Sequence, residues 1–329
     1  MSDHGGTRAI LAALTANLGI AVAKFVAFLF TASSSMLAEA IHSVADSGNQ
    51  LLLLLGGRRA QQAATPEHPF GYGRERYVYG FLVAIVLFLL GGLFALYEGY
   101  HKIQETLDGH AELTSPAWAI GVLVVAIGLE SFSLRTAAHE ARPFKGSGSW
   151  LAFVRRAKAP ELPVVLLEDT AALTGLAFAL VGVSVASVTG NVLWDAAGTI
   201  AIGLLLLVVS ITLGVETKSL LLGESAAAPV LADIEAAVTA DPGVRRLIHM
   251  RTLHLGPDEL LVAAKVAVPP ESTAGAVAAT IDSVERAIRA AVPIARVIYI
   301  EPDLDRVPAV GGEPTSAAVA RPDNTPGPR

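Results

Sequence analysis

The chain contains no cysteine among its 329 residues, and only 16% of its residues are charged. The absence of cysteine excludes disulfide bonds and thiolate ligands, so any metal must be held by His, Asp, Glu, Asn or backbone oxygen. Aromatic residues make up only 6%, and no basic patch with interleaved aromatics indicates a nucleic-acid partner. The hydrophobic content of 53% and the mean hydropathy of +0.54 lie far above those of ordinary soluble proteins. Together these values predict an integral membrane protein.

Several apolar stretches approach or exceed the roughly 20 residues that cross a hydrocarbon core. They cover residues 9–30, 36–57, 77–100, 117–134, 163–186 and 194–215. The first stretch could be a signal peptide, but it is longer than a typical apolar signal core, carries Lys24 and lacks a clear cleavage site. We therefore expect six transmembrane helices.

Basic residues are concentrated in the second and fourth connections between these stretches, at 58–76 and 135–158. Because short loops rich in Lys and Arg face the cytoplasm, both loops are predicted there, and both termini with them. The alanine-rich composition and the absence of a recognisable presequence favour a bacterial plasma membrane.

The composition becomes that of a soluble domain at Gly223. Periodicity and turn residues predict a helix over 230–240, strands over 244–255 and 259–268, a helix over 274–291 capped by Ser272, and a strand over 295–300. The predicted fold is an α-helical membrane protein with six transmembrane helices, followed by a small cytoplasmic α+β (αββαβ) domain. We expect a transmembrane domain at 1–222, a cytoplasmic dimerisation domain at 223–304 and a disordered Pro-, Gly-, Ala- and Ser-rich tail at 305–329.

Polar residues recur inside the second apolar stretch at Glu39, His42, Asp46 and Asn49. Residues four apart stack on one helix face, so His42 and Asp46 have the spacing of two metal ligands. Ionisable groups at membrane depth are costly unless they are paired, hydrated or ligated, which makes this polar stripe a candidate functional site.

The fifth apolar stretch contains two adjacent carboxylates, Glu168 and Asp169. Our interpretation is that His42, Asp46 and Asp169, with Glu168 as a potential fourth ligand, bind a divalent cation in the membrane. One imidazole with carboxylates suits zinc, and also manganese or ferrous iron. Metal entry would release protons from these ligands, which favours a proton-coupled antiporter. The alternative is that the polar groups only hydrogen-bond between helices and fix their packing.

Other polar residues within the apolar stretches are explained as snorkelling or helix-end groups. They are Asn17, Lys24, Glu98, Glu130 near the end of the fourth helix, and Asp195. Lys24 has a second interpretation as a counter-ion to the carboxylates.

The run from Leu37 to Asp46, with its His-x-x-x-Asp spacing, resembles the second helix of cation diffusion facilitators, and residues 68–76 (HPFGYGRER) resemble the loop that follows. The resemblance covers about nine-tenths of the chain. It implies six transmembrane helices, a homodimer, a metallochaperone-like cytoplasmic domain and efflux of zinc or a related cation against inward proton flow. It also implies that His42, Asp46 and Asp169 are ligands.

The chain departs from the family pattern at the first ligand position of the fifth helix, where Val165 stands and cannot ligate. Glu168 is the nearest substitute, and Leu-Glu-Asp-Thr resembles a divergent branch of the family with this carboxylate pair. In the loop, His68 fits the pattern but Tyr72 replaces a second histidine, which makes a metal there doubtful. The cytoplasmic domain has His249 with few further ligands, so we expect it to dimerise largely without metal.

Two other classes of function stay open at this point. A non-transporting membrane sensor or scaffold could bind metal and merely report its concentration. An intramembrane metallohydrolase would need an open coordination position and a general base, which Glu168 could supply, but no hydrolase motif accompanies it. We therefore expect no enzyme, no catalytic residue and no resident cofactor.

Overall fold

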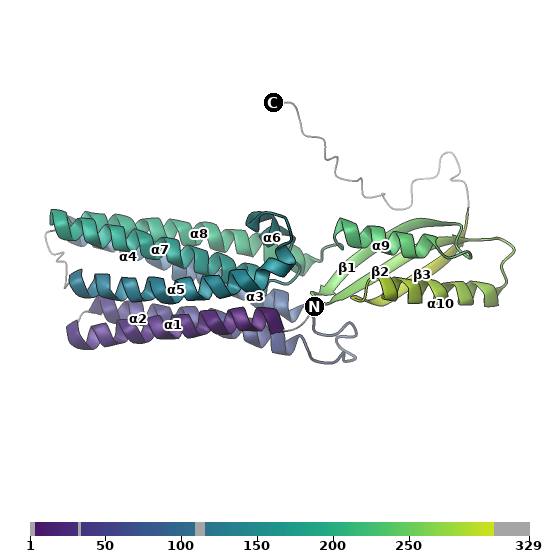
Figure 1. Ribbon diagram of the computed structural model, residues 1–329, viewed down its shortest axis with the longest axis horizontal. Coiled ribbons are helices and arrows are strands. Elements are labelled where there is room, and N and C mark those ends of the chain that lie inside the picture. The colour runs from purple at the N-terminus through teal and green to yellow at the C-terminus, as the bar shows by residue number, and fades with distance from the viewer. Residues whose placement is uncertain (1–3, 32–33, 109–115, 306–329) are drawn as a thin grey trace, which may run out of the picture. The chain divides into compact units, whose positions relative to one another are not determined.

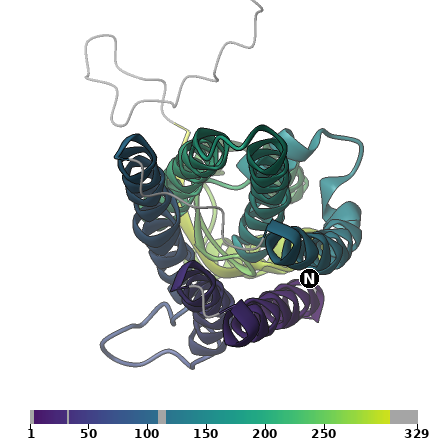
Figure 2. The same cartoon turned by 90° about the vertical axis from the view of Figure 1, so that its left-hand side faces the viewer.

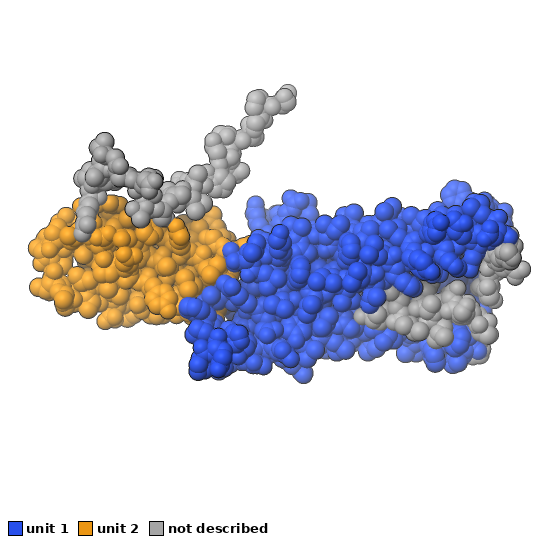
Figure 3. All heavy atoms as spheres, turned by 180° about the vertical axis from the view of Figure 1, so that it is seen from behind, with its two compact units in different colours: residues 1–223, 255–258 blue, residues 224–254, 259–329 orange. Residues whose placement is uncertain are grey.

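The computed structural model describes residues 4–31, 34–108 and 116–305, without the side chains of residues 4, 5, 30, 31, 34–42 and 45. The chain divides into two compact units (Figure 3). Residues 1–223 and 255–258 belong to the first, and residues 224–254 and 259–329 to the second. Most of the predicted disordered tail, residues 306–329, lies outside the described residues.

The first unit is a bundle of long, roughly parallel helices (Figures 1 and 2). They are α1 His4–Thr31, α2 Ser34–Arg59, α5 Pro116–Lys145, α7 Glu161–Thr189, α8 Leu193–Leu222, and a continuous segment made of α3 Glu75–Val86, η1 Leu87–Leu93 and α4 Phe94–Leu107. Within the described residues, five of these segments are long and apolar enough to cross a membrane, and α2 is the exception. Its 26 residues still extend about 39 Å, and polar side chains lower its hydropathy. The predicted six-helix membrane fold is confirmed.

The helices of the bundle pack mostly in neighbouring pairs. Helix α1 packs on α2 and α5, α7 packs on α5 and α8, and the segment from α3 to α4 packs along α8. Small residues permit the closest approach of α4 to α8: a Cβ atom added to Gly203 would lie 2.9 Å from the backbone nitrogen of Leu96. Large apolar side chains such as Val188 and Leu29 are exposed, as expected of side chains that face lipid.

Helix α5 differs from the prediction, because it continues to Lys145 whereas the apolar stretch ends at residue 134. Residues 135–145 are largely polar but remain helical, and hydropathy detects the apolar part of a helix rather than its end. Glu130 therefore lies near the middle of α5, and its predicted place near a helix end was wrong. The short helix α6, Trp150–Arg156, was not predicted; the Ser149 side chain caps it by accepting a hydrogen bond from the Ala152 nitrogen.

The second unit confirms the predicted αββαβ order (Figure 1). Its elements are α9 Ala228–Thr239, β1 Arg246–Gly256, β2 Glu259–Val268, α10 Ala274–Ala291 and β3 Ala295–Leu304. The sheet order is β1-β2-β3, and β2 pairs in parallel with β3. Thr273, not the predicted Ser272, caps α10: its side chain accepts a hydrogen bond from the Ala276 nitrogen at 3.2 Å.

Side chains alternate between the two faces of the sheet. Val262 and Val266 of β2 are fully buried and belong to one core with Ile234 of α9 and Val284 of α10. The side chain of Lys265 points from the opposite face, where it meets Glu301 of β3. The helices therefore cover one face, and the other carries polar groups.

We expect Gly203→Val to destabilise the α4–α8 contact by about 1–3 kcal/mol, because the backbone nitrogen of Leu96, in addition to its side chain, opposes the added Cβ. Thermal unfolding of the purified protein in detergent would show a lower midpoint. Gly121→Val in α5 is the matched control, because a Cβ at Gly121 meets nothing within 4 Å. Equal midpoints for the two variants would contradict the close packing.

Candidate metal centre

Helix α2 directs its polar side chains into the bundle. Ser43, Ser47, Asn49 and Gln50 are buried, and Asp46 is partly buried. His42 lies in α2, but its side chain is outside the described residues. Because α2 is helical throughout this segment, the four-residue spacing places His42 on the same face as Asp46.

Glu168 of α7 is held by two amides of α2. Its side chain is only 7% exposed; Oε1 accepts a hydrogen bond from Asn49 Nδ2 at 3.0 Å, and Oε2 accepts one from Gln50 Nε2 at 3.0 Å. The chain of contacts continues to α1, where Asn17 Nδ2 donates to Gln50 Oε1 at 3.2 Å. Asn17 is thus part of a buried polar network rather than a helix-end group. The network joins three helices through hydrogen bonds that satisfy a buried carboxylate.

Asp169 points to a different helix. Its side chain is 2% exposed, and Oδ2 accepts a hydrogen bond from Ser133 Oγ of α5 at 2.6 Å. A hydrogen bond of this length is typical of a hydroxyl bound to a carboxylate. Adjacent residues of a helix diverge by about 100°, which explains why Glu168 and Asp169 contact α2 and α5, respectively.

Val165 is fully buried among apolar residues that include Val164 and Leu166. Its environment suits a hydrocarbon side chain and provides no polar partner. The position at which the family resemblance implies a ligand is therefore part of the apolar core.

Glu130 of α5 and Lys24 of α1 belong to the same polar region. Glu130 is 5% exposed and interacts electrostatically with Asp169, Asp46 and Lys24. Lys24 is buried, and its Nζ donates a hydrogen bond to Ser43 Oγ at 3.0 Å. The counter-ion interpretation of Lys24 thus agrees with its surroundings. Sequence reasoning missed Ser133 altogether, although Glu130 and Ser133, three residues apart on a helix, share a face.

The ends of two other helices carry an ion pair outside this region. Asp195 in the first turn of α8 pairs with Lys102 of α4 at 3.1 Å. This contact agrees with a structural role for Asp195.

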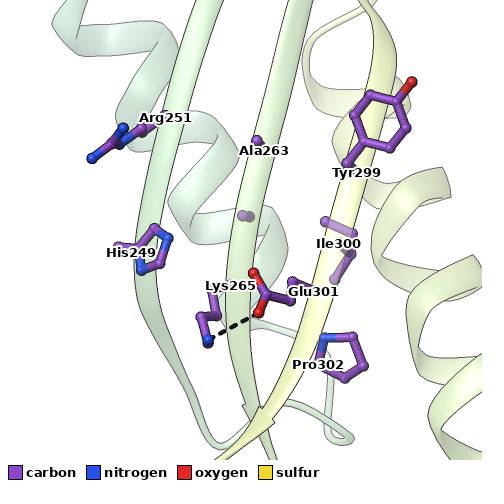
Figure 4. Close-up of a pocket in the computed structure, with 9 residues that line it drawn as sticks. His249, Arg251, Ala263, Lys265, Tyr299, Ile300, Glu301 and Pro302 are labelled. Atoms are coloured by element: carbon purple, nitrogen blue, oxygen red, sulfur yellow. Dashed lines mark hydrogen bonds and ion pairs between the residues drawn. The ribbon is translucent and has the colours of Figure 1, made fainter. Parts of the chain in front are cut away.

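The other histidines considered as ligands have different neighbours. The His68 ring contacts Tyr72 edge-on with centroids 4.7 Å apart, and the Tyr72 hydroxyl lies 3.3 Å from Thr65 Oγ1. In the second unit, His249 shares a sheet face with the basic Arg251 and Lys265 (Figure 4). Positive charges beside an imidazole disfavour a bound cation.

Lys265 is itself paired with carboxylates of β3. Its Nζ lies 2.9 Å from Glu301 Oε1 and 3.0 Å from Asp303 Oδ2. Hydrogen bonds to Glu301 and then to Asp303 raise the pKa of Lys265 above its ordinary value. Lys265 therefore keeps its positive charge on this face.

Among the side chains that the structure describes, no three His, Asp or Glu residues are close enough together to hold a metal ion. That group does not include the side chain of His42. The polar region instead brings together carboxylates from three helices: Asp46 of α2, Glu130 of α5, and Glu168 and Asp169 of α7. Buried negative charges in this number need compensation by protons or cations.

Comparison with known proteins gives matches over both units. The family model described as "Cation efflux transmembrane domain" matches residues 10–222, and "Cation efflux protein, cytoplasmic domain" matches residues 228–303.

Three relatives illustrate the range of similarity. The chain is 34% identical over 236 residues to the proton-coupled zinc antiporter SLC30A9, mitochondrial, of Mus musculus, covering 71% of this chain and 41% of that protein. It is 28% identical over 274 residues to metal tolerance protein C4 of Arabidopsis thaliana, covering 81% and 58%. It is 24% identical over 246 residues to magnetosome protein MamB of Magnetospira sp. (strain QH-2), covering 74% and 76%. The chain thus spans about two-fifths of the length of the first of these relatives.

Proposed function

The chain belongs to the cation diffusion facilitator family, and from this premise we propose that it is a proton-coupled antiporter that exports a divalent metal cation from the cytoplasm. Zinc is the proposed cargo, with manganese and ferrous iron as alternatives. One observation carries the proposal: the buried carboxylates of α5 and α7 interact with one another and with the partly buried Asp46 of α2 inside a membrane-spanning bundle. The relatives whose printed names refer to zinc antiport and metal tolerance support a metal as cargo.

We propose His42, Asp46 and Asp169 as the cation ligands and Glu168 as the candidate fourth. The helical spacing of His42 and Asp46 and the burial of Asp169 support the first three. Both carboxylate oxygens of Glu168 accept hydrogen bonds from Asn49 and Gln50. To bind the cation, Glu168 would share its oxygens between the cation and these amides or give up the hydrogen bonds.

Proton coupling follows from the chemistry of these ligands. A cation binds neutral imidazole and ionised carboxylates, so loading the site releases protons and unloading it takes them up. An imidazole changes its charge near neutral pH, which suits His42 to this exchange. Alternating exposure of the site to the two sides of the membrane would then couple outward cation movement to inward proton movement.

The remaining assignments are part of the same proposal. Residues 1–222 form the transport domain, residues 223–304 form a domain that joins two copies into a homodimer, and residues 305–329 form a disordered tail. The family of the second domain and the match at residues 228–303 support the dimerisation role. The protein acts on a cation and protons in a lipid bilayer, without nucleic acid, without a resident cofactor and not as an enzyme.

Flux separates this proposal from a metal sensor. Reconstituted protein is expected to accumulate zinc in proteoliposomes when a proton gradient is imposed. The flux is expected to disappear in each of three variants, His42→Ala, Asp46→Ala and Asp169→Ala, while the protein still inserts and dimerises. His101→Ala and Asp108→Ala, at exposed positions of α4 and its end, are the controls and should transport normally. Zinc binding without flux in the wild type would favour the sensor, and normal flux in a ligand variant would refute the ligand set.

The role of Glu168 has its own test. Because two amides already hold its carboxylate, Glu168→Gln is expected to weaken zinc binding by about tenfold, as a residue that supports a ligand does. Asp169→Asn removes a proposed ligand and should weaken binding by more than about a hundredfold. Equilibrium zinc titration of both purified variants measures the difference. Equal losses would make Glu168 a ligand of the same standing as Asp169.

We further propose that both termini face the cytoplasm of a bacterium and that the protein lies in its plasma membrane. The concentration of basic residues in loops 58–76 and 135–158 supports the orientation, and the alanine-rich composition supports the bacterial membrane.

Because the chain contains no cysteine, a single introduced cysteine can be labelled without background. An impermeant maleimide added to intact cells is expected to label Ser187→Cys, in an exposed position at the predicted outer end of α7. Ser147→Cys, exposed between α5 and α6, should react only after the cells are opened. The reverse pattern would invert the topology.

A further inference from the structure

Glu130 is a buried carboxylate that the proposed ligand set does not use. It lies near the middle of α5, and its side chain is 5% exposed. Its electrostatic partners include one cation, the ammonium group of Lys24. A carboxylate so deep in an apolar bundle is costly unless something else compensates its charge.

The geometry directs Glu130 toward the candidate metal centre. Ser133 follows it by one helical turn on the same face of α5, and Ser133 Oγ contacts Asp169 Oδ2 at 2.6 Å. The electrostatic partners of Glu130 are Asp169 of α7, Asp46 of α2 and Lys24 of α1. Three neighbouring helices thus present charged groups to the region that Glu130 faces.

Lys24 supplies independent evidence that this region accommodates a cation. Its side chain is only 9% exposed, and Nζ donates to Ser43 Oγ, next in sequence to His42. Burial of an ammonium group is strongly unfavourable without a nearby anion, and Glu130 is one of the anions in range. The chain therefore places a positive charge of its own beside the acidic residues.

We propose that Glu130 is a specificity-determining residue of the cation site: an outer carboxylate that strengthens the binding of a divalent cation held by His42, Asp46 and Asp169. Lys24 balances the charge of Glu130 when no cation is bound. This inference rests on the proposed function. In this proposal Glu130 acts across space rather than as a ligand, and His42, Asp46 and Asp169 are the ligands.

An outer charge of this kind selects for cation valence. The Coulomb attraction between a fixed carboxylate and a cation is proportional to the charge of the cation, so a divalent ion gains twice as much as a monovalent ion at the same place. Monovalent cations should gain less from Glu130 than zinc does, and they should compete poorly with zinc while the carboxylate is present.

Zinc binding to the purified full-length protein, measured by competition with a fluorescent zinc indicator, tests the inference. The binding that remains in Asp169→Ala is subtracted as background. Glu130→Gln is expected to raise the zinc Kd by about tenfold or more, because an unscreened charge near the cation is lost. Glu130→Asp should lose less. Glu98→Gln, which removes a glutamate from α4 outside this polar region, is the matched control and should keep the wild-type Kd.

A double variant distinguishes an electrostatic role from a structural one. Lys24→Met alone should lower the zinc Kd, and Lys24→Met combined with Glu130→Gln should recover most of the affinity lost in Glu130→Gln. A residue that served only packing would keep nearly the wild-type Kd in Glu130→Gln, because glutamine has almost the same shape as glutamate. An unchanged Kd in Glu130→Gln, or no recovery in the double variant, would overturn the inference. If size-exclusion chromatography shows that Glu130→Gln is misfolded, the zinc Kd values of Glu130→Asp and Lys24→Met test the inference instead. An unchanged Kd in both variants refutes it.

Flux measured on the same variants separates this inference from the proposed function. A wild type that binds zinc but does not transport it refutes the antiporter, and the Kd values still decide the role of Glu130. A wild type that transports, with an unchanged Kd in Glu130→Gln, refutes only the role of Glu130. Absence of Asp169-dependent zinc binding in the wild type would overturn both.

Discussion

The cost of burying carboxylates between apolar helices is the constraint on which the first unit depends. Glu168, Asp169 and Glu130 are all less than a tenth exposed, so the fold removes each of these carboxyl groups from water. An unpaired ion in such a place would cost several kcal/mol, so the fold must supply donors or counter-charges from neighbouring helices. The arrangement of α1, α2, α5 and α7 satisfies this requirement.

The donors also determine how these helices meet. Asn49 and Gln50 join α2 to α7, Asn17 joins α1 to α2, and Ser133 joins α5 to α7. Lipid supplies little hydrophobic driving force for helix association, so interhelical hydrogen bonds and close packing contribute a larger share of its specificity. By contrast, α4 and α8 meet through small residues such as Gly203, and Lys102 of α4 pairs with Asp195 in the first turn of α8. The polar half of the bundle is thus adapted to hold charge, and the other half to pack closely.

The sequence was sufficient to predict the six membrane helices and the elements of the second unit, because helical spans and alternating strands leave periodic patterns that depend on local residues. His42 and Asp46 could be placed on one face for the same reason. The partners of Glu168 could not be predicted, since an amide on α2 meets a carboxylate on α7 only through tertiary packing. The position of Glu130 was misjudged because the polar end of α5 hides the length of the helix from hydropathy.

Val165 and Glu130 together determine the charge of the proposed cation site, in which α7 provides one ligand fewer than the family resemblance implies. Val165 is one turn before Asp169 on the same face of α7, and its full burial in apolar surroundings leaves that face with a single carboxylate. Glu168, rotated by about 100°, directs its charge toward the amides of α2 instead. On the proposal made above, Glu130 supplies the missing negative charge from α5. On the same proposal, the ammonium group of Lys24 compensates this additional negative charge when no cation is bound.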